Sequence, residues 1–216
     1  MDEKVIAGQA IYSKIALLNY DLFVLGFSNH LLWKCPTRLI SEQFASLVTE
    51  NHLDVGVGTG YYLKQHLTSN QQRIGLIDLN ENSLEATATV IQHLQPEIYR
   101  RNILEPLALD CKPFDSVSLN YLLHCLPGNL AEKSLVFSHL KEVTNEGGVI
   151  FGSTLLGQGV KKNYCAQKLM AFYNKKGIFC NENDDLLGLK EALDQHFSDV
   201  KIEVVGCAAL FSASSK

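Results

Sequence analysis

The sequence predicts an α/β fold, namely a doubly wound, mostly parallel seven-stranded sheet with a C-terminal antiparallel hairpin and an N-terminal helical lid. Two observations carry this prediction. From about residue 51 onward, short apolar segments alternate with amphipathic segments, which is typical of parallel strands joined by helices. The last two apolar segments are separated only by Gly206 and Cys207, a connection too short for a helical crossover, so these two strands should pair antiparallel.

The seven predicted strands are short runs rich in apolar residues, with glycines or polar residues between them. The turn Asn145–Gly148, which contains two consecutive glycines, leads into the fifth strand. The predicted strands are His52–Gly56, Arg73–Asp78, Glu97–Arg101, Phe114–Asn120, Val149–Thr154, Lys201–Val205 and Ala208–Ser212.

The predicted helices carry apolar residues at intervals of three or four positions, so that one face of each helix can pack on the sheet. In the second helix this spacing joins Leu84, Ala88, Ile91 and Leu94, and Pro96 follows just past its end. The five predicted helices are Tyr61–Leu67, Leu84–Leu94, Asn129–Val143, Asn163–Asn174 and Asp184–His196.

Residues 1–50 lie outside this alternation and are expected to form a helical lid in the same domain as the core of residues 51–216. The chain has 216 residues, and a single domain has roughly 150, so we assign most of the excess to this lid. One face of the expected lid helix is marked by Ile11, Ile15, Leu18 and Leu22.

Composition excludes several classes of protein. The apolar fraction of 46% and the charged fraction of 19% allow a large buried core, and the net charge of -4 argues against a nucleic-acid partner. The six cysteines contain no C-x-x-C pair, so reduced thiols and no metal site are expected. No segment has the ~20 apolar residues of a membrane span, and the acidic N-terminus lacks the positive charge of a signal peptide. We therefore expect a cytoplasmic protein.

A glycine-rich loop follows the first predicted strand. In the segment Asp54–Gly60, with the sequence DVGVGTG, three glycines let the chain turn sharply and approach a ligand closely, and the helix that follows presents free N–H groups. The second strand ends at Asp78, whose carboxylate can accept hydrogen bonds from both hydroxyls of a ribose. Ligands of open parallel sheets bind at the carboxyl ends of the strands, so a nucleoside cofactor is expected there.

The glycine spacing distinguishes between nucleoside cofactors. The dinucleotide fingerprint G-x-G-x-x-G/A needs a small third residue, and this chain has Tyr61 at that position, which disfavours NAD. Instead, Leu53–Tyr61 resembles the first motif of class I S-adenosylmethionine-dependent methyltransferases, G-x-G-x-G with an acidic residue two positions earlier. The resemblance continues in Gly75–Asn80, which is similar to the ribose-binding strand, and in Phe114–His124, which is similar to the fourth motif.

The resemblance implies S-adenosylmethionine as the cofactor, S-adenosylhomocysteine as its product, and no metal. Asn102 stands where the family often has an acidic residue that contacts adenine, and its amide oxygen can accept a hydrogen bond from the adenine amino group. The implied cofactor-binding residues are Tyr20, Trp33, Asp54, Gly56, Gly58, Thr59, Gly60, Tyr61, Asp78, Leu79, Asn102, Ile103, Asn120 and Tyr121.

A second, partial resemblance concerns the N-terminal segment. Tyr20-Asp21 followed by His30-x-x-Trp33 is similar to the lid of quinone-biosynthesis C-methyltransferases, although the two pairs lie closer together here and that family's glutamate after the fifth strand is absent. The resemblance implies a relative that acts on a different small molecule. Tyr20 and Trp33 are either cofactor or lid contacts or ordinary core residues.

Two histidines are candidate catalytic bases. His124 follows the fourth strand, where the resemblance places the transferred methyl group, and His30 is the second candidate; imidazole titrates near neutral pH. Either histidine can instead be a structural residue held by hydrogen bonds. Methyl transfer from a sulfonium is an in-line displacement in which the protein aligns the reactants and excludes water, so no obligatory catalytic residue is expected.

The expected function is transfer of a methyl group from S-adenosylmethionine to a small, apolar or aromatic molecule by O- or C-methylation, with N-methylation left open. The apolar and aromatic side chains of residues 11–33 favour such an acceptor. Two alternatives remain: an NAD(P)-dependent oxidoreductase that uses the same crevice, and a non-catalytic cofactor-binding protein that has lost its acceptor pocket.

Overall fold

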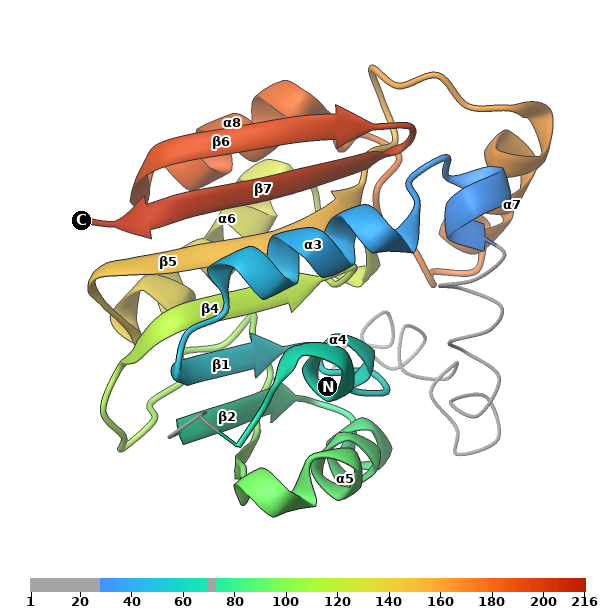
Figure 1. Cartoon of the computed structure of the whole chain (residues 1–216). Helices are drawn as coiled ribbons and strands as arrows, with labels where there is room; N and C mark the ends of the chain where they lie inside the picture. The colour runs from blue at the N-terminus through green and yellow to red at the C-terminus, as the bar shows by residue number, and fades with distance from the viewer. Residues whose placement is uncertain (1–27, 70–72) are drawn as a thin grey trace.

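Seven strands form one sheet at the centre of the molecule (Figure 1). In the computed structural model, which describes residues 28–69 and 73–216, the strand order is β3-β2-β1-β4-β5-β7-β6. Strands β1 to β5 pair in parallel, and β7 is antiparallel to both of its neighbours, which confirms the predicted sheet and its C-terminal hairpin. The strands are β1 (Asn51–Val55), β2 (Arg73–Asp78), β3 (Glu97–Arg100), β4 (Phe114–Asn120), β5 (Thr144–Leu155), β6 (Phe197–Val205) and β7 (Ala208–Ser215).

Helices cover both faces of this sheet (Figure 1). One face packs against α3, α4 and α5 through a cluster that includes Phe44, Leu63 and Leu84, and the other packs against α6 and α8. Helix α7 stands at the end toward which the parallel strands point. The helices are α3 (Thr37–Leu47), α4 (Tyr61–His66), α5 (Glu81–Val90), α6 (Leu130–Glu142), α7 (Tyr164–Lys175) and α8 (Leu186–Asp194).

Local side-chain chemistry explains where several of these helices begin. At the start of α6, Asn129 Oδ1 accepts a hydrogen bond from the Glu132 N–H at 3.2 Å, and Glu132 Oε2 accepts one from the Asn129 N–H at 2.8 Å. This reciprocal pair satisfies two N–H groups that have no partner inside the helix. Asn163 and Asp185 cap α7 and α8 in the same way from one side.

Several predicted boundaries are wrong. Strand β6 begins at Phe197 and not at Lys201, and β7 ends at Ser215 and not at Ser212. Two other differences change the type of element expected. The helix expected to reach Leu94 ends as an α-helix at Val90, and its last apolar positions continue in the short 3₁₀ turn η2 (Gln92–Leu94). The segment expected as a turn, Asn145–Gly148, lies inside β5, which already pairs at Thr144 and then shifts register. Gly147 has a φ of +73° in this stretch, so the strand absorbs the glycines as an irregularity and continues.

The described part of the N-terminal segment packs on the sheet and at its carboxyl end. Phe44 of α3 is fully buried, and its ring lies 5.6 Å from that of Phe151 in β5. Before α3, a helical turn closes with a hydrogen bond from the Trp33 N–H to the Ser28 carbonyl at 2.9 Å. Helix α3 is an element within residues 1–50 that the sequence pattern did not predict separately. The lid helix expected over residues 11–22 lies outside the described residues.

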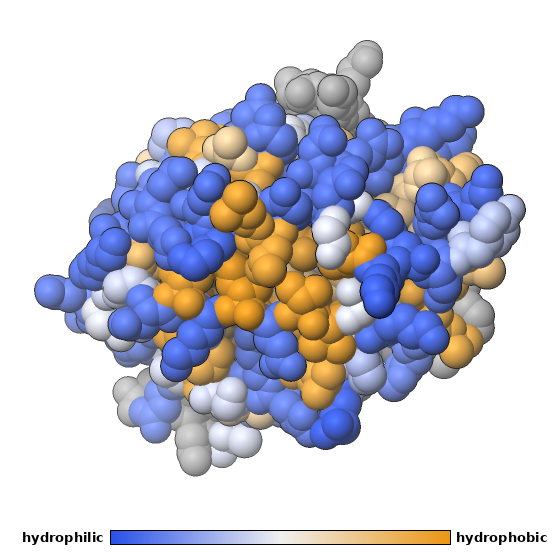
Figure 2. All heavy atoms as spheres, turned by 90° about the horizontal axis from the view of Figure 1, so that it is seen from above, coloured by the Kyte–Doolittle hydropathy of each residue, from blue (hydrophilic) through white to orange (hydrophobic). Residues whose placement is uncertain are grey.

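Strand β6 forms one edge of the sheet. Seen from above in Figure 2, the molecule shows an apolar patch surrounded by hydrophilic side chains. The strand itself exposes Lys201 and Glu203 next to Val204, and charged side chains of this kind discourage pairing of an open edge with another chain. The opposite edge, β3, carries the exposed Ile98, with Glu97 directly before it and the exposed Arg100 two positions after it.

Candidate active site

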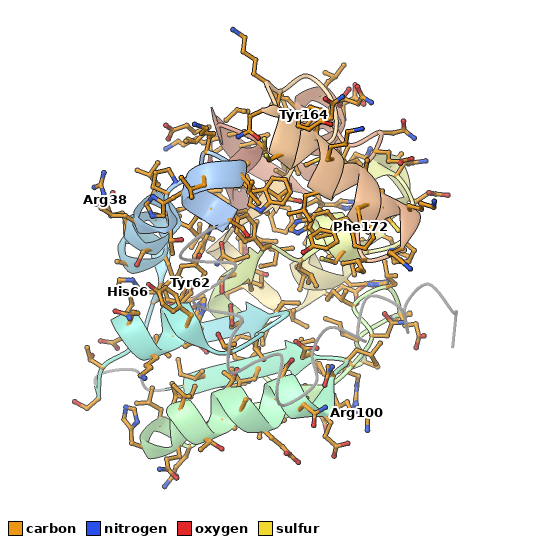
Figure 3. All side chains as sticks on the ribbon, turned by 90° about the vertical axis from the view of Figure 1, so that its right-hand side faces the viewer. Arg38, Tyr62, His66, Arg100, Tyr164 and Phe172 are labelled. Carbon is orange, nitrogen blue, oxygen red and sulfur yellow. The ribbon has the colours of Figure 1, made fainter. Side chains whose placement is uncertain are left out.

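A cavity opens at the carboxyl ends of β1, β2 and β4, the place where ligands of open parallel sheets bind. Figure 3 faces this end of the molecule, with Tyr62 of α4 on one side and Phe172 of α7 on the other. The cavity brings together twelve of the residues predicted to bind the cofactor. They are Asp54, Gly56, Gly58, Thr59, Gly60, Tyr61, Asp78, Leu79, Asn102, Ile103, Asn120 and Tyr121.

The loop between β1 and α4 needs glycine for two different reasons. Gly56, Gly58 and Gly60 all have positive φ angles, of +73°, +54° and +73°. A side chain at Gly56 would come within 2.9 Å of Leu122, and one at Gly60 within 2.9 Å of Thr87. At Gly58 no heavy atom lies within 4 Å of the position of an added Cβ. The backbone at Gly58 is therefore open to close approach by a ligand.

Asp78 ends β2 beside this loop. Its Oδ1 accepts a hydrogen bond from the Asn80 N–H at 2.8 Å. Burial raises the pKa of Asp78 to about 6, while hydrogen bonds from the main chain of Asn80 and Gly58 oppose that rise. The carboxylate is thus held in place by the loops around it and lines the cavity.

Asp54 lies deeper, at the end of β1. The Ser118 hydroxyl donates a hydrogen bond to Asp54 Oδ1. Burial raises the pKa of Asp54 to about 7; the bond from Ser118 lowers the pKa, and the nearby charge of Asp78 raises it further. The cavity therefore holds two carboxyl groups whose ionisation is more difficult than in water.

The predicted adenine contact, Asn102, makes two local hydrogen bonds. Its Oδ1 accepts from the Leu104 N–H at 3.1 Å, and its Nδ2 donates to Glu105 Oε1 at 2.9 Å. These bonds fix the amide of a residue that lines the cavity, next to the buried side chain of Ile103. One lone pair of the amide oxygen remains for a ligand.

Asn120 ends β4 and Tyr121 follows it directly, and both residues line the cavity. Asn120 Oδ1 accepts a hydrogen bond from the Ser153 hydroxyl at 3.0 Å, whereas its Nδ2 is buried without a hydrogen-bond partner among the described residues. Such a donor is costly unless a ligand or water satisfies it. Tyr121 has a φ of +55°, an unusual conformation for a residue with a side chain, and its N–H donates to the Ser153 carbonyl at 2.8 Å.

Comparison with known proteins places the chain in a family. Residues 53–150 match the sequence profile of a methyltransferase domain. The chain is 37% identical to demethylluteothin O-methyltransferase of Streptomyces thioluteus over 99% of this chain and 93% of that protein. It is 38% identical to the physcion biosynthesis cluster O-methyltransferase of Aspergillus chevalieri, over 95% of this chain and 94% of that protein. This chain belongs to the methyltransferase family. The predicted membership of the class I S-adenosylmethionine-dependent methyltransferases is confirmed.

Two further comparisons show similarity in sequence and in fold. The methyltransferase is 43% identical to the YbcY protein of Escherichia coli (strain K12) over 89% of this chain and 100% of that protein. Its fold matches the crystal structure of the N-methyltransferase NodS from Bradyrhizobium japonicum WM9 in complex with S-adenosyl-l-homocysteine, with a TM-score of 0.66. That alignment covers 99% of each chain at 12% identity, so it shows a shared fold.

The methyltransferase does not bring its two candidate histidines to the described cavity. His124 is buried in the 3₁₀ turn η3 (Leu123–Cys125), where its Nδ1 accepts a hydrogen bond from the Leu155 N–H at 3.3 Å. Its ring lies 4.6 Å from that of Phe179, and burial, together with the charge of Lys133, lowers its pKa to about 3. His30 is exposed and does not line the cavity.

The two predicted lid contacts have different outcomes. Trp33 is buried, with its ring 6.2 Å from that of Phe179, and it does not line the cavity. The described structure thus gives Trp33 the contacts of a core residue, the second of the two readings of its sequence. Tyr20 lies outside the described residues.

The cavity also has lining residues that sequence analysis missed. Most of them are neighbours in sequence of the predicted positions, and this neighbourhood is the feature that could have indicated them. Hydrophobic periodicity could not, because the side chains of a short turn after a strand can point toward the cavity or away from it. The additional polar and apolar lining residues include Tyr62, Arg101, Leu104, Leu122, Cys125, Leu126 and Pro127.

Two absences concern the described part of the chain only. Residues 28–69 and 73–216 hold no group of three or more His, Cys, Asp or Glu side chains arranged to bind a metal ion. Among the same residues, no helix has the length and apolar character needed to cross a membrane.

Proposed function

We propose that this methyltransferase transfers the methyl group of S-adenosylmethionine to an oxygen atom of a small, apolar or aromatic molecule. The observation that carries the proposal is the near full-length similarity to proteins named O-methyltransferases, combined with a cavity lined by both polar and apolar side chains. C-methylation of an electron-rich ring is the second candidate, because the same apolar lining residues would hold such a ring.

Three features of the cavity support S-adenosylmethionine as the cofactor. The open backbone at Gly58 allows close approach, the Asp78 carboxylate can accept from both ribose hydroxyls, and the buried Asn120 Nδ2 offers a donor to a ligand atom. When bound, the cofactor supplies a methyl group already activated by its sulfonium. The chain's own residues then hold and orient the reactants and exclude water.

The apolar part of the cavity lining supports an apolar acceptor. Leu122, Leu126 and Pro127 line the cavity together with the aromatic residues Tyr62 and Tyr121. Among the described residues no histidine lines the cavity. We therefore expect the acceptor oxygen to belong to a group that ionises in solution, such as an acidic phenol or a carboxylate, so that no imidazole base is needed.

Calorimetric titration with S-adenosylmethionine, S-adenosylhomocysteine and NAD tests the cofactor. Tight binding of NAD without binding of either sulfur nucleoside would refute the proposal in favour of the oxidoreductase alternative. An acceptor screen that follows formation of S-adenosylhomocysteine tests the reaction, and the ¹³C shift of a transferred labelled methyl group separates an O-methyl from a C-methyl product. Cofactor binding without transfer to any phenol, carboxylic acid or electron-rich ring would favour the non-catalytic alternative.

We also propose that the residues preceding α3 form a lid that belongs to the same domain as the core. We further propose that the protein acts in the cytoplasm and that its substrate is a small molecule and not a nucleic acid. The net charge of -4 supports the last point. Removal of residues 1–27 should leave the unfolding of the core cooperative while lowering the rate of methyl transfer. An unchanged rate would show that these residues take no part in the site.

A further inference from the structure

A row of polar side chains crosses the interior of the sheet next to the cavity. His52 and Asp54 of β1 pair in register with Ser116 and Ser118 of β4, and all four side chains are buried. Residues two apart on a strand share a face, so the four lie on one side of the sheet. Strands of a parallel sheet buried on both faces are normally apolar, and buried polar groups are costly unless they are hydrogen-bonded.

These side chains form a continuous chain of hydrogen bonds that ends at the cavity. The Thr49 N–H donates to Ser116 Oγ at 3.0 Å, and Ser116 Oγ lies 2.7 Å from His52 Nδ1. On the other side of the ring, His52 Nε2 lies 3.1 Å from Ser118 Oγ. The Ser118 hydroxyl in turn contacts Asp54 Oδ1. Asp54 is the member that lines the cavity.

The position of each proton in this chain of hydrogen bonds follows from its two ends, the Thr49 N–H and the Asp54 carboxylate. When Asp54 is ionised it can only accept, so Ser118 donates its one proton to Asp54 and accepts from His52 Nε2–H. Burial lowers the pKa of His52 to about 3, with the main chain of Ser116 opposing, so the ring is neutral and its Nδ1 accepts from the Ser116 hydroxyl. Ser116 accepts from the Thr49 N–H. Every proton in the chain then points toward Asp54.

Protonation of Asp54 allows the reverse order. The carboxyl group then donates to Ser118, and Ser118 donates to His52 Nε2. The ring carries its proton on Nδ1 and donates it to Ser116, whose own proton turns to Thr49 Oγ1 at 2.9 Å. Both orders satisfy the same contacts, so the protonation of Asp54 is linked to the tautomer of His52.

We propose that His52, Ser116 and Ser118 are positioning residues that orient Asp54 and stabilise its ionised form for contact with the ammonium group of the bound cofactor. This proposal rests on the proposed function for its ligand. The chain of donors ends at Oδ1 of Asp54, and Asp54 itself lines the cavity.

The other groups around this chain of hydrogen bonds either disfavour the ionised form of Asp54 or carry no charge that would favour it. From β2, the charge of Asp78 disfavours ionisation of Asp54. From the helices on this face, α3 presents the ring of Phe44, 5.4 Å from His52, and α4 presents Tyr62 and His66 (Figure 3). Burial is the largest influence and raises the pKa of Asp54. Among the described residues, the hydrogen bond that Ser118 donates at the end of this chain is therefore the feature that favours the ionised form of Asp54.

Titration of S-adenosylhomocysteine at a series of pH values tests this role. The affinity of the unmodified protein should rise with pH as Asp54 ionises. Ser118→Ala removes the donor and should move the midpoint of that rise upward by about one pH unit, whereas Ser118→Thr keeps the hydroxyl and should restore the midpoint. Ser134→Ala is the matched control. Ser134 of α6 is also buried, and its hydroxyl donates a hydrogen bond to Gln195 Oε1 at 2.8 Å, but it does not line the cavity. An unchanged midpoint in Ser118→Ala would overturn the proposal.

The tautomer of His52 provides a second measurement that needs no variant to fold. In protein with ¹⁵N-labelled histidine, the His52 ring should carry its proton on Nε2 at high pH and on Nδ1 at low pH, with the same midpoint as the affinity. A single tautomer across that midpoint would refute the linkage. If S-adenosylhomocysteine does not bind at any pH, the proposed cofactor is wrong, and the tautomer measurement still decides whether the chain is linked to Asp54.

Discussion

Replacing Gly58 by alanine separates the two consequences of a side chain in the glycine loop. With a φ of +54°, Gly58 has a left-handed conformation that costs about 1–2 kcal/mol for a residue with a Cβ. No heavy atom lies within 4 Å of the new Cβ, so the protein itself imposes no further clash. For a domain of this size, we expect the melting temperature to fall by about 2–8 °C.

The same methyl group would stand where the cofactor approaches. Forcing one extra carbon into a filled site costs about 1–3 kcal/mol, which corresponds to an affinity for S-adenosylhomocysteine that is about 5 to 150 times weaker. Gly159→Ala is the matched control, because Gly159 has a φ of +72°, equally open space around its Cβ and no place in the cavity. It should lose similar stability and keep its affinity.

Thermal unfolding and calorimetric titration of the two variants, side by side, make the comparison. Equal affinities of Gly58→Ala and Gly159→Ala would refute the assignment of the loop to the cofactor. Equal losses of affinity in both variants would also refute it, because the effect would then follow stability and not the position of the methyl group.

Three further predictions concern charged residues. Asp78→Ala should weaken binding of S-adenosylhomocysteine by about 1–3 kcal/mol in calorimetry through loss of charge-assisted hydrogen bonds, and an unchanged affinity would remove Asp78 from the site. Lys133 and Asp184 form a fully buried ion pair at 2.6 Å, so Lys133→Met should lower the free energy of unfolding in urea by about 3–5 kcal/mol. Adding Asp184→Leu should restore most of this loss, and no recovery would contradict the explanation. Because burial raises the pKa of Asp54 from 3.8 to about 7, the stability that Asp54 contributes is full below pH ~4 and is lost as the pH rises to 7. Asp54→Asn should therefore unfold with a smaller pH dependence than the unmodified protein across this range, and an equal dependence would contradict the assignment.

The parallel half of the sheet could be predicted from sequence because its strands are short apolar runs with clear ends. The bounds predicted for Arg73–Asp78 and Phe114–Asn120 are those observed. Helix α3 was missed, although Ile40 and Phe44 have helical spacing and are fully buried, because residues 1–50 were treated as one lid. The glycines at 147 and 148 were read as a turn, since sequence does not reveal that a neighbouring strand continues to pair across them.

Which candidate residues line the cavity follows from the sequence where backbone geometry sets their position, and does not follow where side-chain direction sets it. The glycine loop and Asp78 need particular conformations at particular places, and sequence records both. His124 was predicted on its position after β4, but the turn η3 directs its ring toward Phe179 and into the interior. Its direction depends on packing against residues distant in sequence, which a local pattern does not contain.

The position of β7 between β5 and β6 has a consequence for synthesis of the chain. β5 pairs with β4 on one side, but its second neighbour is made only after α7, α8 and β6. During that interval the long β5 has an open edge, and unpaired edges of nascent sheets are sites of aggregation. Slowing elongation between β5 and β7 should therefore lower the soluble yield more than slowing it between β1 and β2, where parallel neighbours follow each other closely.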